Sequence, residues 1–176
     1  MSKLAEKPKT NELYDTDFFL WTQEQARLLR DKRWNDLDLE NLAGEVESVG
    51  ISLKRELESR LEIILAHLLK WRYQPGYQGK SWRTTLWEQR RQIHKLIATA
   101  PSLKSYTADA LADAYVAATL EAEKQTGIDV AVFPGSCPFT LEQALDQDFF
   151  PPDLGFDDQS GMKKLSQKRK AQKAPL

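Results

Sequence analysis

The sequence contains a single cysteine, Cys137, and only two histidines, His67 and His94. One cysteine excludes an intramolecular disulfide and any zinc site built from several cysteines. Neither histidine lies in an HExxH or a Glu-x-x-His pattern, so the sequence supports neither a zinc protease nor a ferritin-like di-iron site. The loop PGYQGK lacks both the spacing of a phosphate-binding P-loop and a preceding strand. We therefore predict no bound metal and no cofactor.

Long apolar segments are also missing. No apolar run approaches the ~20 residues that a membrane-spanning helix needs. The first residues, MSKLAEKPKTNEL, lack the apolar stretch of a signal peptide. With 41% hydrophobic and 29% charged side chains in 176 residues, the composition is that of a water-soluble globular domain. We expect a cytoplasmic protein that makes no membrane contact.

Charge is distributed unevenly along the chain. The formal net charge is −1, yet residues 157–176 carry six Lys/Arg against two Asp, which leaves the other residues at −5. Because this C-terminal stretch has few apolar residues, we predict a basic disordered tail over 157–176. Residues 1–12 are predicted to be a flexible leader and residues 13–156 a single helical domain.

Apolar residues at helical spacing predict five main helices, with short connections between them. The fold class that follows is all-α, a mostly antiparallel bundle. Thr140 and Gln143 have capping-box spacing for a short C-terminal helix, and the irregular segment FFPPDLGF after it should pack back across the bundle. Capping and breaking residues set the limits of the main helices at Asp15 or Thr16 to Arg30–Lys32, Asp36 or Asp38 to Gly50, Ser52 to Pro75–Gly76, Ser81 to Pro101, and 103–126 before Gly127.

A basic and aromatic stretch between Lys70 and Lys95 is the first candidate site. It holds seven Lys/Arg against one acid, with five Trp or Tyr interleaved. Guanidinium groups bind phosphates in a bidentate manner, and indoles offer flat surfaces on which bases stack. No helix-turn-helix or RNA-binding sheet pattern is present. The pattern predicts a noncatalytic binding module for an anionic partner, either nucleic acid or an acidic protein. The predicted contacts are Lys70, Trp71, Arg83, Trp87, Arg90, Arg91 and His94.

The same residues have an intramolecular alternative. The predicted second and third helices are rich in acids, and a neighbouring helix could absorb the arginines in ion pairs. The tryptophans would then be core residues. The acids in question are Glu40, Glu45, Glu47, Glu56, Glu58 and Glu62.

A second candidate is a set of polar side chains on those two helices: Glu45, Glu47, Arg55, Ser59, His67 and Lys70. A turn at Gly50 would fold the two helices together. With the two glutamates holding a divalent cation and His67 or Lys70 acting on phosphate, the protein would be a metal-assisted phosphodiesterase or nuclease. However, Glu-x-Glu places its carboxylates ~200° apart on a helix. An ion-pair network that fixes helix register explains the set without catalysis, so no catalytic residue is assigned.

Two further features have mainly structural interpretations. Cys137 has no histidine near it in sequence and is expected to be a small buried hydrophobic residue. Alanines at i, i+4 spacing along 103–126 predict a core ridge, with a homo-oligomer seam as the alternative. A third possible function is accordingly a protein–protein adaptor that binds no nucleic acid.

A series of short motifs follows in order along the chain. They are Tyr14-Asp15-x-Asp17-Phe18-x-x-Trp21, Leu29-Arg30, Asp38-Leu39-Glu40-x-Leu42, Glu45-Val46-Glu47, Arg55-x-Leu57-x-Ser59, His67-Leu68-Leu69-Lys70-Trp71, Gln74-Pro75, Trp82, Gln89-Arg90, Pro101-Ser102-Leu103, Tyr115, and Phe133-Pro134 through Cys137-Pro138. In this order they resemble one family, the bacterial domain of unknown function 29. The resemblance covers roughly Tyr14 to Pro151 and implies an α-helical bacterial protein, but it implies no activity. One departure is Gly44, where the family usually has another Glu.

Overall fold

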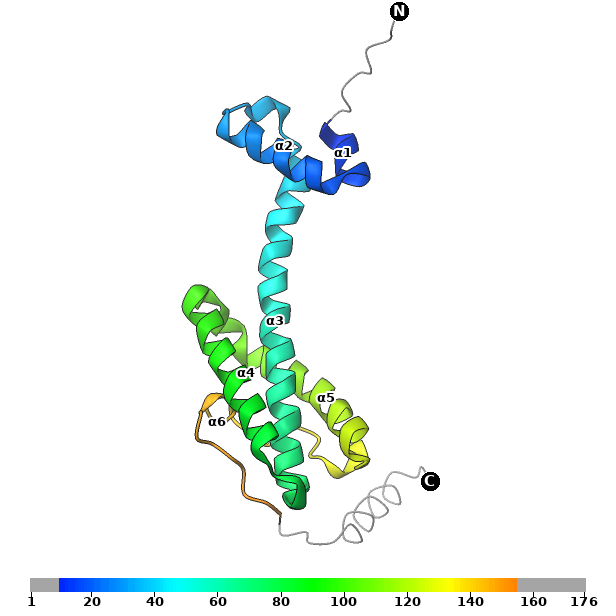
Figure 1. The fold of residues 1–176 in the computed structure, drawn as a ribbon, viewed down its shortest axis with the longest axis vertical. Coiled ribbons are helices and arrows are strands. Elements are labelled where there is room, and N and C mark those ends of the chain that lie inside the picture. The colour runs from blue at the N-terminus through cyan, green and yellow to red at the C-terminus, as the bar shows by residue number, and fades with distance from the viewer. Residues whose placement is uncertain (1–9, 155–176) are drawn as a thin grey trace, which may run out of the picture. The chain divides into compact units, whose positions relative to one another are not determined.

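The computed structural model describes residues 10–154, which form α-helices and short 3₁₀ turns without any strand (Figure 1). This confirms the predicted all-α fold. The expected tail lies outside the described residues, as does the expected leader except for residues 10–12, which belong to α1. The helices are α1 (Thr10–Thr16), α2 (Phe18–Arg30), α3 (Leu39–Tyr73), α4 (Lys80–Thr99), α5 (Thr107–Thr126) and α6 (Leu141–Leu145). None of the helices within 10–154 has the length and apolar character needed to cross a bilayer.

The chain forms two compact units that divide after Ser52. The first unit is organised around Trp21 of α2, which is buried and donates its indole N–H to Asp38 Oδ2 at 3.1 Å. The ring of Tyr14 meets Trp21 edge-on at 5.0 Å, and the ring of Phe18 stacks on it at 5.5 Å. Asp17 rather than Asp15 or Thr16 caps α2, because its carboxylate accepts from the Leu20 backbone N–H at 3.0 Å.

A single helix, α3, replaces the predicted second and third helices. Gly50 was expected to end a helix, but it lacks the positive φ of a C′ glycine and lies within the helix. Ser52 was expected to cap the next helix, but its hydroxyl donates to the Ser48 carbonyl at 2.9 Å, a bond made inside a continuous helix. The prediction of a break at Gly50 was therefore wrong.

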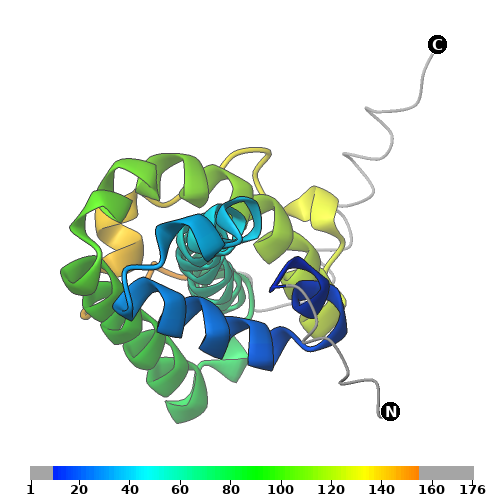
Figure 2. The ribbon, with the colours of Figure 1, turned by 90° about the horizontal axis from the view of Figure 1, so that it is seen from above.

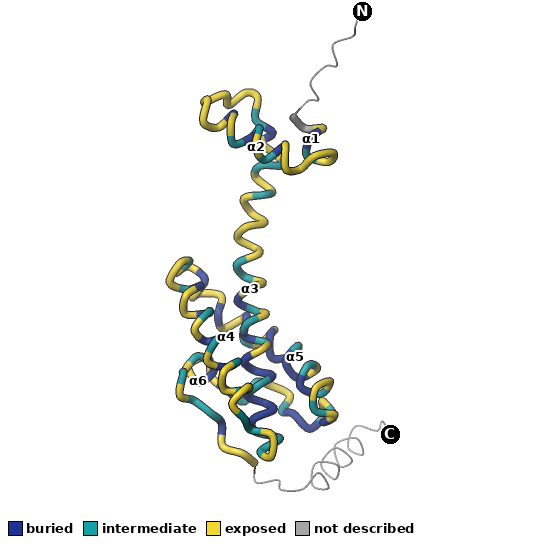
Figure 3. The backbone as a smooth tube through the Cα atoms, in the orientation of Figure 1, coloured by how far each residue is buried: buried dark blue, intermediate teal, exposed yellow. Residues whose placement is uncertain are grey.

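The second unit has a core built around the second half of α3, with α4 on one side and α5 on the other (Figures 1 and 2). From Leu57 onward one face of α3 is buried, whereas most residues from 46 to 52 are exposed (Figure 3). The alanine ridge of α5 belongs to this core, as expected. Its members are Ala110, Ala114, Ala118 and Ala122.

In the second unit some predicted helix limits are confirmed and others are not: α4 begins at Lys80 with Gly79 as its N-cap instead of Ser81, and α5 begins at Thr107 instead of 103. Gly127 ends α5 in the left-handed region with φ of 71°. The predicted capping box of α6 forms, since Thr140 Oγ1 accepts from the Gln143 N–H and Gln143 Oε1 from the Thr140 N–H. The segment after Gly127 contains a short 3₁₀ turn, Val130–Val132.

Candidate functional site

Two of the predicted contact residues, Arg83 and Trp87, lie on the exposed face of α4. They are four residues apart, so their side chains leave the same side of the helix. Trp87 is 55% exposed. A single exposed apolar side chain is ordinary in a folded domain, and Trp34 is exposed to the same degree, so Trp87 is of interest only because of the polar groups beside it.

The guanidinium of Arg83 is held by aromatic rings rather than by an acid. Its Cζ lies 5.3 Å from the ring centre of Trp71 and 5.3 Å from that of Phe150. The Trp71 and Phe150 rings also pack on each other, at 4.6 Å. Within residues 10–154 this guanidinium makes no ion pair with a carboxylate and no hydrogen bond. The rings therefore fix the position of the guanidinium N–H donors, which have no acceptor among the described residues.

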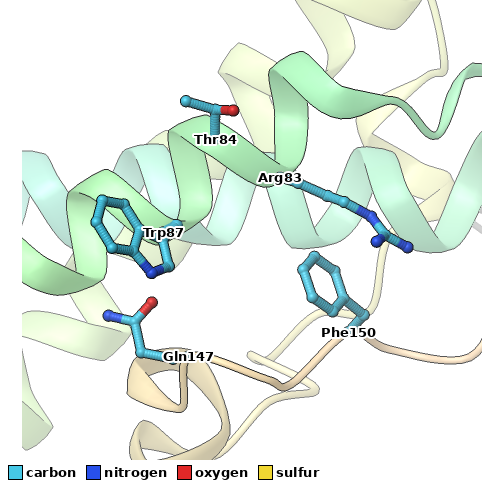
Figure 4. A pocket seen from close by; sticks show the side chains of 5 residues that line it. All are labelled: Arg83, Thr84, Trp87, Gln147 and Phe150. Carbon is cyan, nitrogen blue, oxygen red and sulfur yellow. The ribbon is translucent and has the colours of Figure 1, made fainter.

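A pocket of about 260 Å³ lies beside these residues (Figure 4). Arg83 and Phe150 stand at one end, and Trp87 and Gln147 at the other. The amide oxygen of Gln147, Oε1, is buried and has no hydrogen-bond partner among the described residues. It points toward the Trp87 indole (Figure 4). An unsatisfied buried acceptor costs about 1–3 kcal/mol, so this oxygen requires an explanation.

Arg90 requires a correction, because it is not on the surface. It is completely buried (0% exposed) and hydrogen-bonds the carbonyl oxygens of Ala144, Gln147 and Phe149 at 2.9, 3.3 and 2.9 Å. Burial lowers the pKa of its guanidinium, while Asp146 and Asp148 oppose that shift. Arg90 thus cannot contact an external partner. Its hydrogen bonds hold the segment that carries Gln147 and Phe150 against α4. Arg90 therefore positions one wall of the pocket without being exposed in it.

The other predicted contacts on α4, Arg91 and His94, are exposed, but each already has a hydrogen-bond partner within the protein. Arg91 forms two hydrogen bonds with Glu88, at 2.8 and 2.9 Å, and this partner lowers the pKa of Glu88 to about 2. His94 Nε2 lies 3.2 Å from the Leu145 carbonyl oxygen, which makes this nitrogen the protonated donor. Of the exposed arginines in the predicted stretch, Arg83 is thus the better placed for a ligand.

Lys70 and Trp71 are also buried, which corrects their prediction as surface contacts. Lys70 Nζ donates to Gln125 Oε1 at 2.6 Å, lies 3.3 Å from His67 Nε2 and sits 5.0 Å from the Trp82 ring centre. Burial lowers the pKa of the ammonium. These three neighbours occupy its donors, so Lys70 belongs to the interior of the second unit.

His67 is a neutral acceptor for Lys70. Its Nδ1 lies 2.8 Å from the Ile63 carbonyl oxygen, a contact that requires N–H on Nδ1 and leaves Nε2 free to accept. Burial lowers the pKa of the imidazole, and the nearby Lys70 lowers it further.

The two candidate carboxylates lie in the first unit. Glu45 accepts a 2.7 Å hydrogen bond from the Tyr14 hydroxyl, which raises the pKa of that phenol, and Glu47 is exposed. The turn at Gly50 that was to bring them toward Arg55 and Ser59 does not form. In residues 10–154, no group of three or more His, Cys, Asp or Glu gathers as a metal site. This arrangement gives the metal-assisted alternative no support.

The proposed ion pairing between α4 and the acids of α3 is also not found in the described residues. Glu56 pairs with Arg60 one turn along its own helix, at 2.8 Å, and Arg91 pairs with Glu88 in the same local way. Instead, Arg83 rests on aromatic rings, Arg90 hydrogen-bonds backbone carbonyls, and Arg91 pairs with a glutamate of its own helix.

Cys137 is half-buried against the core, as expected of a structural residue. Its Sγ–H donates to the Phe139 carbonyl oxygen at 3.3 Å, and burial raises the pKa of the thiol. A raised pKa keeps the group as a thiol, which is a poor nucleophile.

Three pocket residues were not predicted from the sequence: Thr84, Gln147 and Phe150. The aromatics of FFPPDLGF gave a partial signal, because they were expected to pack back across the bundle, and Phe150 does so. Nothing in the sequence marks Gln147, whose position depends on carbonyls held by a residue 57 positions earlier.

Comparison with known proteins agrees with the motif-based resemblance. A family model described as Domain of unknown function DUF29 matches residues 13–150. A search of curated proteins and a search of solved structures found no significant match.

Proposed function

The chain belongs to the DUF29 family, and from the geometry of its pocket we propose that it is a noncatalytic module that binds a polyanion. The observation that carries the proposal is the guanidinium of Arg83, which has no ion pair or hydrogen bond within residues 10–154 and is held by two rings one helical turn from an exposed tryptophan. Stacking on the rings fixes the direction of the guanidinium fork, so less conformational entropy is lost when it binds an anion.

Nucleic acid suits this surface better than an acidic protein. An acidic peptide offers carboxylates for Arg83 but no flat group for the Trp87 indole. A nucleotide offers both a phosphate and a planar base, and aromatic–base stacking is worth about 1–3 kcal/mol. The proposal places the module in the bacterial cytoplasm, where the basic C-terminal residues would add sequence-independent attraction. An adaptor that binds only protein, alone or as a homo-oligomer, is the competing proposal.

The test is fluorescence anisotropy of labelled single- and double-stranded oligonucleotides at rising salt. For the wild type, log affinity should fall linearly with log salt. Arg83→Gln should weaken binding and reduce the salt slope by about 1, because one phosphate contact is lost. Removal of residues 157–176 should weaken binding while keeping the Arg83 dependence.

Arg91→Gln is the matched control. It removes the same charge from an exposed position of the same helix, but Arg91 is already paired with Glu88. The control should therefore retain more affinity than Arg83→Gln. Absence of binding at low salt, or equal losses in the two variants, would overturn the proposed function.

A further inference from the structure

We propose that the pocket between α4 and the segment after α6 holds one unpaired base of a single-stranded nucleic acid. Trp87 stacks on the base, Gln147 Oε1 accepts a hydrogen bond from its edge, and Arg83 binds the adjoining phosphate. The inference rests on the proposed function and deepens it, since it specifies a single-stranded ligand and a role for each end of the pocket.

The unsatisfied amide oxygen of Gln147 is the first support. Buried acceptors in folded proteins nearly always have a partner, and those that lack one are often completed by a ligand or water. Each of the four common bases carries N–H donors on its Watson–Crick edge, so any unpaired base can supply the missing hydrogen bond. In a duplex that edge is already occupied.

Trp87 is the second support, because the amide oxygen of Gln147 points toward its indole (Figure 4). Its indole is 55% exposed and, among the described residues, makes no hydrogen bond. Rotation of the indole outward would uncover Gln147 Oε1 and open a slot between the two side chains. A base that enters this slot gains a stacking surface on one side and an acceptor at its edge.

Charge fixes the direction in which the ligand lies. Asp146 and Asp148 flank Gln147 in sequence and are exposed, whereas Glu88, which follows Trp87 on α4, is paired with Arg91. A phosphate is therefore disfavoured at the Gln147 end of the pocket. Arg83 stands at the other end, beside Phe150 (Figure 4). The base thus points toward Gln147 and its phosphate toward Arg83.

The size of the pocket, before any rotation of the indole, suits one planar group better than a whole cofactor. At about 260 Å³ it lies below the usual range for sites that enclose whole cofactors, which begins at about 300 Å³. The neighbouring nucleotides would run along the surface of α4.

The experiment compares three labelled probes of equal length in the anisotropy assay, with the full chain as the protein. They are a single-stranded oligothymidylate, an abasic oligonucleotide with the same phosphates, and a duplex. The abasic probe and the duplex should bind roughly 5- to 150-fold more weakly than the oligothymidylate, the range that loss of one stacked base predicts. Trp87→Ala should remove this difference by weakening the oligothymidylate alone.

Gln147→Leu provides a second variant that is not confounded by unfolding. Leucine fills similar space without an unsatisfied acceptor, so the melting temperature of the free protein should rise by about 2–4 °C. Binding of the oligothymidylate should nevertheless weaken, with the abasic probe unaffected. Unchanged affinity for the oligothymidylate would overturn the role of Gln147.

Two further outcomes separate this inference from the proposed function. Equal binding of the abasic probe and the oligothymidylate, still weakened by Arg83→Gln, would overturn the base pocket and leave the polyanion-binding module intact. If no oligonucleotide binds while a polyglutamate peptide does, the nucleic-acid function and the base pocket both fail.

Discussion

Arg83 and Arg90 lie two turns apart on α4, and the structure uses them in opposite ways. Arg83 is exposed and rests on two rings, whereas Arg90 is buried and hydrogen-bonds three backbone carbonyls. A guanidinium can serve several acceptors at once because it carries five N–H donors in a fixed plane. From sequence, both residues belong to the same basic face, and only the packing of residues 144–149 separates their roles.

Replacement of Arg90 by lysine should destabilise the fold. Lysine keeps the charge but presents a compact ammonium that cannot reach three carbonyls, so buried acceptors lose their donors. We expect the free energy of unfolding to fall by about 3 kcal/mol, measured by urea denaturation. Arg91→Lys on the same helix should change it by less than about 0.5 kcal/mol, because Arg91 is exposed. Similar losses in the two variants would show that the carbonyl bonds of Arg90 contribute little.

His67 should make stability depend on pH in a defined direction. Burial and Lys70 lower the pKa of the folded imidazole below its unfolded value of about 6.5. The unfolded chain therefore binds the proton first as pH falls, and stability is lost as pH drops through about 6.5 toward the folded pKa.

The measurement is the urea midpoint of wild type and His67→Gln between pH 7.5 and 5.5. The wild type should lose more stability over this interval than the variant, in which the carboxylates titrate as before but the imidazole is absent. Parallel curves would mean that His67 takes up its proton equally well in the folded protein.

At the scale of the elements, sequence signals located some helix ends correctly, but they misplaced the N-caps of α2 and α4 and missed the continuity of α3. The capping box at Thr140, the left-handed Gly127 and the stop before Pro101 all appear where the sequence places them. These are local devices in which one residue satisfies one or two backbone groups. Gly50 has no such unambiguous chemistry, because glycine is tolerated inside a helix at a cost of about 1 kcal/mol. Whether the helix ends at such a glycine or continues through it depends on the surrounding structure.

A pair of glycine substitutions tests the continuity of α3. Gly50 is helical and a Cβ there would meet nothing within 4 Å, so Gly50→Ala should raise the free energy of unfolding by about 0.5–1 kcal/mol. Gly127→Ala should lower it by about 1 kcal/mol, because φ of 71° strains any L-residue with a Cβ. Thermal or urea unfolding of the two variants gives both values. A destabilising Gly50→Ala would indicate a break in the helix at that position.

For the molecule as a whole, the sequence predicted the fold class and the family but only part of the site. Hydrophobic periodicity, capping residues and the order of motifs are local properties of the sequence, and they are enough to predict the all-α fold and the family. The pocket combines Arg83 and Trp87 with Gln147 and Phe150, which lie about sixty positions away. Such a site depends on tertiary packing, and neither a charge count nor a helical wheel reveals which arginine faces outward.

Whole-chain charge also limits what the site can do. Without residues 157–176 the chain carries a net charge of −5, so long-range attraction of a polyanion is weak. The proposed binding would then depend on short-range contacts made by a few side chains. The proposed site offers such contacts, since it combines an aromatic surface with a guanidinium that has no ion pair within residues 10–154.

The bonds from Arg90 to residues 144, 147 and 149 also have a kinetic consequence. They join positions 54 to 59 residues apart, so they form only after a long loop has closed. During synthesis, α3, α4 and α5 emerge before the segment that satisfies this guanidinium. A partly folded bundle would therefore lack the pocket, and the proposed capacity to bind would arise as one of the last steps of folding.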